Sequence, residues 1–536
     1  MHSFDLLIGF LLVSLVVAVV VKRLNFPYPI ALVIAGLAIA LLPGTPHVSI
    51  DPEVIFYIFM PPILAEAAYF TSWRDFWRWR RAIFLLAFGL VTATTVSVAA
   101  LCVAMIPGVG WPTGFLLGAI VSPPDAAAAT SIMRNFHLPR RVVQILEGES
   151  LVNDAAALTV YRFAIAAIVS GTFSFHRAAL SFLWTAGIGT AIGIVSAYLL
   201  VKLYPYFKDP QVEILSTFLL GYIAYVSAEA AHSSGVLAVV SSGLLFAWYA
   251  PQLFSANTRL RAGAVWETTI FLMNATVFLA IGLQLPNATA ALRMYGRTDL
   301  WYWGGTLAFA VILARILWVF PATYLPRALS KGIREREPHP SWRAVSVVAW
   351  TGLRGVVSLA AAEALPRTMA NGMPFPDRDL ILFLTFVIIM TTLVLQGLTL
   401  GPLIKLLKIE PDHSLREEHI VARIHATERA LQRLRELESS ISTDSAVIHR
   451  VRGYYDDRLS SLRAELEIAA SPDGGAQPEE FQSIAEQKIW WELAKAERHA
   501  VLSLRRQRRI GDEAMHQIER DIDLLEARII PRDHER

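Results

Sequence analysis

The sequence predicts an all-α polytopic membrane protein followed by a helical tail. Hydrophobic residues make up 54% of the 536 residues, and the mean hydropathy of +0.46 is too high for an ordinary soluble protein. Charged residues are about three times as dense after residue 404 as before it. We therefore divide the chain into a transmembrane domain, 1–404, and a water-exposed tail, 405–536.

Thirteen apolar segments have the length of a membrane-spanning helix, bounded by proline, glycine or clustered charges. The first lacks the basic n-region and small-residue cleavage site of a signal peptide, so we expect it to be a retained span. The segments are 4–21, 29–43, 53–70, 82–107, 112–133, 144–169, 178–201, 211–230, 233–250, 264–284, 301–323, 344–365 and 379–404.

Lysine and arginine are concentrated in alternate connections between these segments. The connections after the first, third, fifth, seventh, ninth and eleventh segments carry about 18 of them, and the others carry about 5. The positive-inside rule places the basic connections in the cytoplasm. This predicts an N-terminus outside and a cytoplasmic tail. We also expect a location in a cell (inner) membrane, because the sequence shows no targeting features.

Thirteen spans with an odd one between two sets of six would place the two sets in opposite orientations, as in an inverted repeat. Helix breakers occupy the fifth span of each set: "IVSPPDAAAA" in span 5 and "WTGLRGVVS" in span 12. A Pro-Pro pair removes two backbone donors and paired glycines weaken a helix, so we expect spans 5 and 12 to be interrupted. Interrupted helices at matching positions indicate a transporter site.

The tail is rich in helix formers, with one-sided apolar stripes on two segments separated by "SPDGGAQP". We expect these helices to pack on each other or on a second tail, as a regulatory or oligomerisation region. The net charge is about +7 before residue 405 and about −4 after it, and neither value indicates nucleic-acid binding. The stripes are Ile420, Ile424, Leu431 and Leu434, and Met515, Ile518, Ile522 and Leu525.

Six ionisable residues are predicted at membrane depth. A charge at the bilayer centre costs roughly 2.5–3.5 kcal/mol on insertion scales, so such residues are candidates for function. The six are Glu66, Asp125, Glu149, Asp154, Arg315 and Arg354. The carboxylates and hydroxyls near them are hard oxygen ligands, which suit an alkali cation.

On a helix, Asp154 shares a face with Ser150, and Asn153 shares an adjacent face with Glu149. We expect the Asp154 face to bind the cation, and Glu149 to pair with a base. Span 5 adds Asp125 at its break, where unwound carbonyls up to Pro124 would face the same cavity.

Glu66, one turn after a Pro-Pro pair in span 3, is either a cation ligand or part of the water path. Burial disfavours an ionised carboxylate, whereas a bound cation favours it, so cation and proton can compete for one group. Asp154 is the first choice for that group.

The sequence indicates neither an enzyme nor a cofactor. Cys102 is the single cysteine, which excludes an internal disulfide and argues against a Cys-ligated metal. The acids are not accompanied by a Ser-His pair or a His-rich metal set, and His232 lies at the end of a span.

Three motifs resemble the monovalent cation:proton antiporter family of bacterial and eukaryotic sodium/proton exchangers, over about residues 4–404. "GESLVNDAAALTVY" resembles the family's Glu-Ser-x-x-Asn-Asp motif, "MPPILAEAAY" its Pro-Pro-Ile-Leu-Phe-Glu-Ala motif, and "TGLRGVVSLA" its Gly-Leu-Arg-Gly segment.

The resemblance implies an elevator-type antiporter, usually a homodimer, that serves pH and sodium homeostasis. It implies Asp154 as the ion- and proton-binding carboxylate, with Asn153, Ser150 and Glu66 as further participants, so that Asp154, Ser150 and Glu66 would form a Na⁺ site. It also implies that Glu149 pairs with Arg315. An Asn-Asp pair marks the electroneutral branch, so one cation per proton is expected.

The resemblance also places Arg354 near the crossing of spans 5 and 12, which holds Gly352 and Gly355 as well. The chain departs from many relatives at Pro124-Asp125-Ala126, where they have Thr-Asp-Pro. A hydroxyl ligand is thereby absent, which leaves selectivity open among sodium, lithium and potassium. Two alternatives remain: potassium/proton antiport on the same scaffold, and a transporter-like membrane sensor that signals through the tail.

Overall fold

The protein is described here by a computed structural model covering residues 2–24, 26–42, 52–133, 136, 138–171, 175–284, 295–337, 339–369, 372–409, 414–440, 445–469 and 507. Contacts divide the chain into two compact units, Met1–Asp412 and His413–Arg536. The first unit contains the segments predicted to span the membrane. The second contains the predicted tail, although helix α20 of the first unit runs past residue 404 to Leu407.

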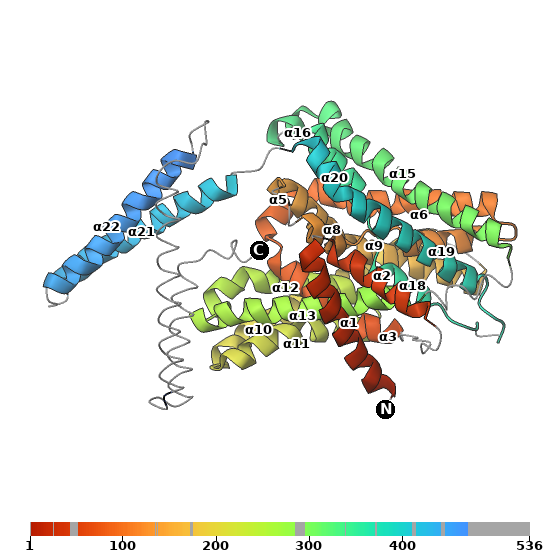
Figure 1. The fold of residues 1–536 in the computed structure, drawn as a ribbon, viewed down its shortest axis with the longest axis horizontal. Helices are drawn as coiled ribbons and strands as arrows, with labels where there is room; N and C mark the ends of the chain where they lie inside the picture. Colours follow the sequence, from red (N-terminus) through yellow and green to blue (C-terminus); the bar gives the residue numbers. More distant parts are fainter. Residues whose placement is uncertain are drawn as a thin grey trace. The chain divides into compact units, whose positions relative to one another are not determined.

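The first unit is a bundle of helices packed side by side (Figure 1). The described residues form no β-strand. The helices are α1 (His2–Leu24), α2 (Tyr28–Ala40), α3 (Pro52–Val54), η1 (Ile55–Phe59), α4 (Met60–Phe70), α5 (Trp73–Phe84), η2 (Leu85–Leu90), α6 (Val91–Met105), α7 (Trp111–Val121), α8 (Ala126–Met133), α9 (Arg140–Ser170), α10 (Phe175–Leu203), η3 (Tyr204–Tyr206), α11 (Pro210–Ala230), α12 (Gly235–Leu253), α13 (Ala256–Leu283), α15 (Arg297–Leu329), α16 (Lys331–Arg336), α17 (Trp342–Trp350), α18 (Val356–Glu363), α19 (Arg378–Thr391), η5 (Thr392–Gln396) and α20 (Gly397–Leu407).

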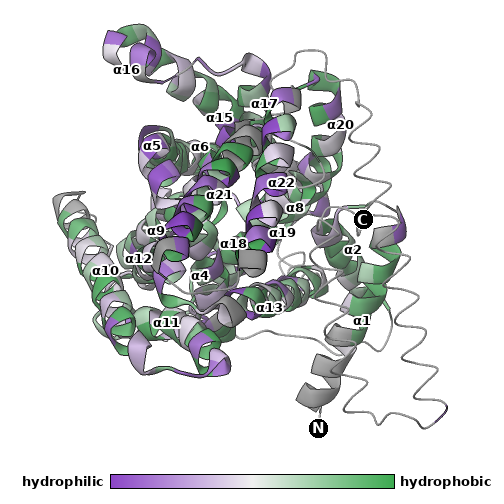
Figure 2. Ribbon diagram, turned by 90° about the vertical axis from the view of Figure 1, so that its left-hand side faces the viewer, coloured by the Kyte–Doolittle hydropathy of each residue, from purple (hydrophilic) through white to green (hydrophobic). Residues whose placement is uncertain are grey.

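The prediction of an all-α membrane protein is confirmed. Each of the thirteen predicted segments coincides with one or more helices, and nine helices in the described residues are long and apolar enough to cross a membrane. Three further apolar helices are shorter: Leu12–Val21, Tyr28–Ala40 and Ile55–Phe70. Figure 2 shows α1 and α2 as mainly hydrophobic, whereas α5 carries many hydrophilic residues. The count of thirteen crossings and the inverted repeat stay predictions.

The two interruptions lie where the sequence predicts them. Span 5 consists of α7 and α8, separated by non-helical residues 122–125, and span 12 consists of α17 and α18, separated by residues 351–355. In span 5, Pro123 and Pro124 cannot donate backbone hydrogen bonds, so the helix cannot continue through them. In span 12, Gly352 and Gly355 lie within the break.

The Pro-Pro pair of span 3 has a different effect. Span 3 stays helical through Pro61 and Pro62, but a π-helical turn, η1, precedes them. Pro62 lacks the N–H that would bond to the carbonyl four residues earlier, at Ile58. The Tyr222 hydroxyl of α11 donates to that carbonyl at 2.8 Å. A neighbouring helix therefore supplies the missing donor.

Close approach of α2 and α13 depends on glycine. A Cβ added to Gly36 would overlap the backbone of α13, and one added to Gly282 would overlap the backbone of α2. These helices are among the most extensively packed pairs in the unit. Small residues allow backbones to approach in this way where lipid gives no hydrophobic driving force.

In the second unit, α21 (Ser414–Ser440) and α22 (Ser445–Ala469) pack on each other. Ile420 and Ile424 of the predicted stripe are buried against Leu462 of α22. The predicted stripe at Met515, Ile518, Ile522 and Leu525 lies outside the described residues.

Candidate functional site

The candidate site lies where the two interrupted spans cross beside α9. The Asp125 N–H donates to the Leu353 carbonyl at 2.7 Å, which joins the break of span 5 to that of span 12. A Cβ added to Gly355 would overlap the Asp125 carboxylate. Gly355 therefore lets an acidic side chain lie directly against the second break.

Arg354 anchors the crossing from span 12. It is 1% exposed, and its Nε donates to the Val121 carbonyl at 2.8 Å and its Nη2 to the Ser122 carbonyl at 3.3 Å. Its Nη1 donates to the Gly352 carbonyl. The carbonyls at the C-terminus of α7 carry partial negative charge, so they stabilise this buried cation without a carboxylate.

Glu149 and Arg315 form a second buried anchor, between α9 and α15. Arg315 Nη1 and Nη2 donate to the two carboxylate oxygens of Glu149 at 2.6 and 2.9 Å. The Glu149 side chain is 1% exposed and the Arg315 side chain is 0% exposed. Arg315 Nε also donates to the Val348 carbonyl of α17 at 3.1 Å. One arginine thus connects α9, α15 and the first half of span 12.

Asn153 and Ser150 join α9 to the break of span 5. Asn153 Nδ2 donates to the Pro124 carbonyl at 3.0 Å, and the Ala126 N–H donates to Ser150 Oγ at 3.4 Å. The sequence predicts that Ser150 and the carbonyls up to Pro124 face an ion. In the structure Ser150 Oγ and the Pro124 carbonyl each accept a hydrogen bond from the protein, so a bound cation would use a remaining lone pair of either group. Asn153 Oδ1 is buried with no hydrogen-bond partner among the described residues.

Asp154 is 6% exposed on α9, one turn after Ser150. The negative charge of the Asp125 carboxylate is close enough to act on it. Within the described part of the chain, no basic side chain stabilises the ionised form of Asp154. Glu66 is half-buried on α4, which packs against α9.

Two polar residues of span 13 also hold the crossing, and sequence reasoning missed them. Thr392 Oγ1 accepts from the Arg354 N–H at 3.2 Å, and Gln396 Nε2 donates to the Trp350 carbonyl at 2.9 Å. The sequence contains a pattern that could have identified them. They are four residues apart in an apolar segment, which places them on one face of a helix. Polar residues in such a position face the interior of a bundle.

A family model for "Sodium/hydrogen exchanger, transmembrane" matches residues 10–406. The protein therefore belongs to the sodium/hydrogen exchanger family of membrane transporters.

Individual relatives agree with this assignment. The chain is 31% identical to an uncharacterised Na(+)/H(+) exchanger of Mycobacterium tuberculosis, over 97% of this chain and 96% of that one. It is 31% identical to a sodium, potassium, lithium and rubidium/H(+) antiporter of Bacillus pumilus, over 70% of this chain and 57% of the relative.

The fold is similar to that of the sodium proton antiporter MjNhaP1 from Methanocaldococcus jannaschii. The TM-score is 0.61 at 20% sequence identity, over 76% of this chain and 99% of that one.

Proposed function

We propose that the protein is a secondary active antiporter that exchanges Na⁺ for H⁺ across the membrane, with Asp154 as the shared binding group. The observation that supports this proposal is a buried carboxylate without a basic partner, beside two broken helices. An uncompensated buried charge is costly, so this carboxylate is stable only with a proton or with a bound cation. Exchange of one for the other is antiport.

The cation ligands in this proposal are the Asp154 carboxylate, Asn153 Oδ1 and the remaining lone pairs of Ser150 and Pro124. Glu66 and Asp125 complete the oxygen-rich surroundings. The protein needs no cofactor for this exchange, and we assign no catalytic reaction to it. Na⁺ is the cargo of the site and not a resident metal.

The test is cation-induced proton movement in inside-out vesicles, followed with a pH-sensitive dye. We expect Asp154→Asn to abolish the response, because an amide can neither release a proton nor balance a cation's charge. Glu267→Gln, which changes an exposed carboxyl on α13, is the control and should retain normal exchange. Normal exchange by Asp154→Asn would disprove the assignment of the coupling group.

Potassium/proton exchange is a second candidate, favoured by the Bacillus pumilus relative, whose name includes potassium among its cations. The same vesicle assay, run with sodium and with potassium, distinguishes the two functions. A response to sodium that exceeds the response to potassium supports our proposal. A response to potassium without one to sodium would replace sodium as the cargo.

We also propose one-for-one, electroneutral exchange, because Asp154 is the single exchanging carboxylate beside the neutral Asn153. In proteoliposomes, an imposed membrane potential should leave the exchange rate unchanged within about twofold. A rate that rises steeply with potential would show that net charge moves in each cycle, since one elementary charge is worth about 2.3 kcal/mol per 100 mV.

An elevator-type motion, a homodimer and the orientation predicted from the basic connections complete the proposed function. In this arrangement the crossing, with α9, moves as one body that exposes Asp154 to each side in turn. The buried anchors at Arg315 and Arg354 support such rigid movement, because they join the helices that must move together.

A further inference from the structure

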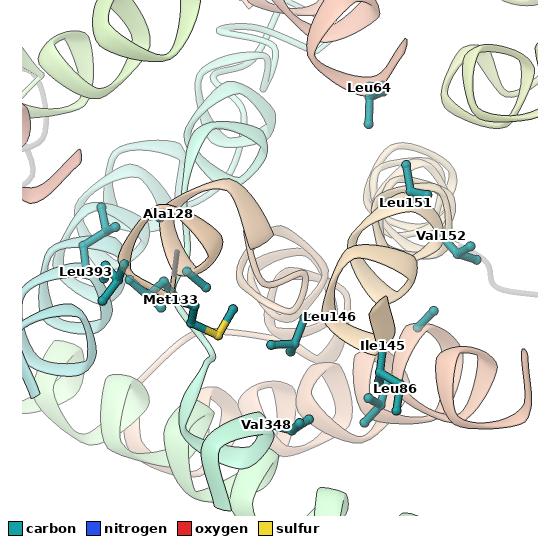
Figure 3. Close-up of a cluster of buried hydrophobic side chains, with 14 of the residues drawn as sticks. Leu64, Leu86, Ala128, Met133, Ile145, Leu146, Leu151, Val152, Val348 and Leu393 are labelled. Carbon is teal, nitrogen blue, oxygen red and sulfur yellow. The ribbon is translucent and has the colours of Figure 1, made fainter. Parts of the chain in front are cut away.

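A cavity of about 180 Å³ lies away from the cation site, among α5, α9, α15 and α17. Most of its lining is apolar and includes Leu86, Ile145 and Val348. Figure 3 shows Leu86 and Ile145 side by side. The volume is below the roughly 300–1,000 Å³ of drug-sized ligand sites, so it suits a head group or a small anion.

Three arginines from three helices line the same cavity: Arg81, Arg141 and Arg327. Arg81 Nη2 and Arg327 Nη2 both donate to Glu337 Oε2, at 2.6 and 2.5 Å, and Arg81 Nε donates to Glu337 Oε1 at 3.0 Å. Arg141 stacks over the Trp79 ring at 4.3 Å. Arg81 and Arg327 share the carboxylate of Glu337, so these three residues carry a net charge of about +1 at neutral pH.

Two donors of these arginines are unsatisfied. Arg81 Nη1 and Arg327 Nε are buried and have no hydrogen-bond partner among the described residues. Buried donors are rarely left without an acceptor, because burial removes the water that would otherwise bond to them. Arg327 itself is 4% exposed. An acceptor-rich anion would satisfy both groups.

Glu337 is an internal competitor for such an anion. Burial disfavours its ionised form, but the Arg81 hydrogen bond and the charges of Arg81, Arg327 and Arg141 outweigh burial and lower the pKa of Glu337. It is therefore ionised at neutral pH. It follows α16 in the short connection between α15 and α17, outside the apolar helices.

The surroundings place the cavity at the level of lipid head groups. Trp77 of α5 and Trp342 of α17 are 53% and 60% exposed on helices that line it. Exposed tryptophan beside arginine is typical of the membrane–water interface. Two lining residues also adjoin the buried anchor, since the Val348 carbonyl accepts from Arg315 and Ile145 is one turn before Glu149.

We propose that this cavity is a binding site for a phosphate-bearing anion, held by Arg81, Arg141 and Arg327 in competition with Glu337. Arginine guanidinium groups match the geometry of phosphate oxygens. The bound anion ties together α5, α9, α15 and α17, which also hold the Glu149–Arg315 pair. Its binding therefore stabilises the part of the protein that carries the proposed cation site.

The test measures thermal unfolding of the full-length protein in a neutral detergent, so it does not depend on transport. The added probes are short-chain phosphatidylglycerol, inorganic phosphate and short-chain phosphatidylcholine, which has no net charge. We expect phosphatidylglycerol to raise the unfolding temperature in a saturable way and phosphatidylcholine to have little effect. Stabilisation by phosphate alone would identify a free anion as the ligand. Equal stabilisation by both lipids, or by none of the probes, would overturn the proposal.

Opposite effects of two variants make the test specific. Arg81→Gln should weaken binding about tenfold, because it removes a charge-assisted hydrogen bond. Glu337→Gln should strengthen binding by a similar factor, because it removes the competing charge and not the donors. Arg80→Gln, on the exposed side of α5, is the matched control and should bind normally. Unchanged or weaker binding by Glu337→Gln would contradict the proposed competition, even if Arg81→Gln failed to fold.

Discussion

At the scale of single residues, the site depends on where small side chains permit close contact. Gly355 lies directly against Asp125, and its φ of −146° is outside the left-handed region. The requirement for glycine at this position is therefore steric. Because Asp125 also bonds through its N–H to Leu353, it cannot move away without disturbing the crossing.

Gly355→Ala tests this steric requirement. The added methyl group should displace Asp125 and slow cation/proton exchange about tenfold or more, since small displacements at a reacting site have large effects. The unfolding free energy should fall by about 1–3 kcal/mol, as for other overpacked sites. Gly305→Ala on α15 is the control, because its Cβ would have no neighbour within 4 Å. Equal exchange rates for the two variants would show that the contact with Asp125 is unimportant.

At the scale of helices, buried polar contacts replace the backbone hydrogen bonds that broken helices lose. Arg354 binds the last carbonyls of α7, Asn153 binds the carbonyl before Asp125, and Tyr222 binds the carbonyl that Pro62 leaves free. In lipid each such group would otherwise cost several kcal/mol. The breaks are therefore tolerated because neighbouring helices satisfy them.

The Glu149–Arg315 pair should contribute strongly to the stability of the packing of α9 against α15. We expect Glu149→Gln to lower the unfolding free energy by about 3–5 kcal/mol, because Arg315 would remain buried without its counter-ion. The double variant Glu149→Met and Arg315→Met should recover much of that loss, since two apolar side chains leave no buried charge. Thermal unfolding in detergent measures both. A single variant as stable as the unmodified protein would contradict the role of the pair.

At the scale of the whole molecule, the first unit has its own buried core and contains every residue of the proposed cation site. The tail helices α21 and α22 bury a small cluster of their own. Each unit therefore has buried residues of its own, so transport and a sensor function can be distinguished by removing the tail.

Truncation after Asp412 distinguishes a transporter from a sensor that signals through the tail. The shortened protein should reach the membrane and exchange cation for proton at a rate within about threefold of the full-length rate, since a domain with its own core can fold alone. Vesicles with matched amounts of each protein give the comparison. Loss of exchange by a truncated protein that still folds, shown by normal thermal unfolding, would mean that the tail is needed for transport.

Much of this organisation is predictable from local features of the sequence. The apolar lengths of the spans, the Pro-Pro pair in span 5 and the paired glycines in span 12 act on the chain where they occur. The membrane class and both interruptions follow from them. The position of Asp154, one helical turn from Ser150, is likewise a local property. The pairing of Glu149 with Arg315, 166 residues away, was implied by family resemblance and not by any local pattern.

Other features required the tertiary structure. Pro-Pro at residues 61–62 resembles the pair in span 5, yet that helix continues, because α11 supplies a hydroxyl to the freed carbonyl. Only the packed structure shows that Ser150 and Pro124 already accept hydrogen bonds, or that three arginines from separate helices meet at one cavity. A sequence determines which groups a chain must bury, whereas the packing of distant segments decides which partners satisfy them and which are left for a ligand.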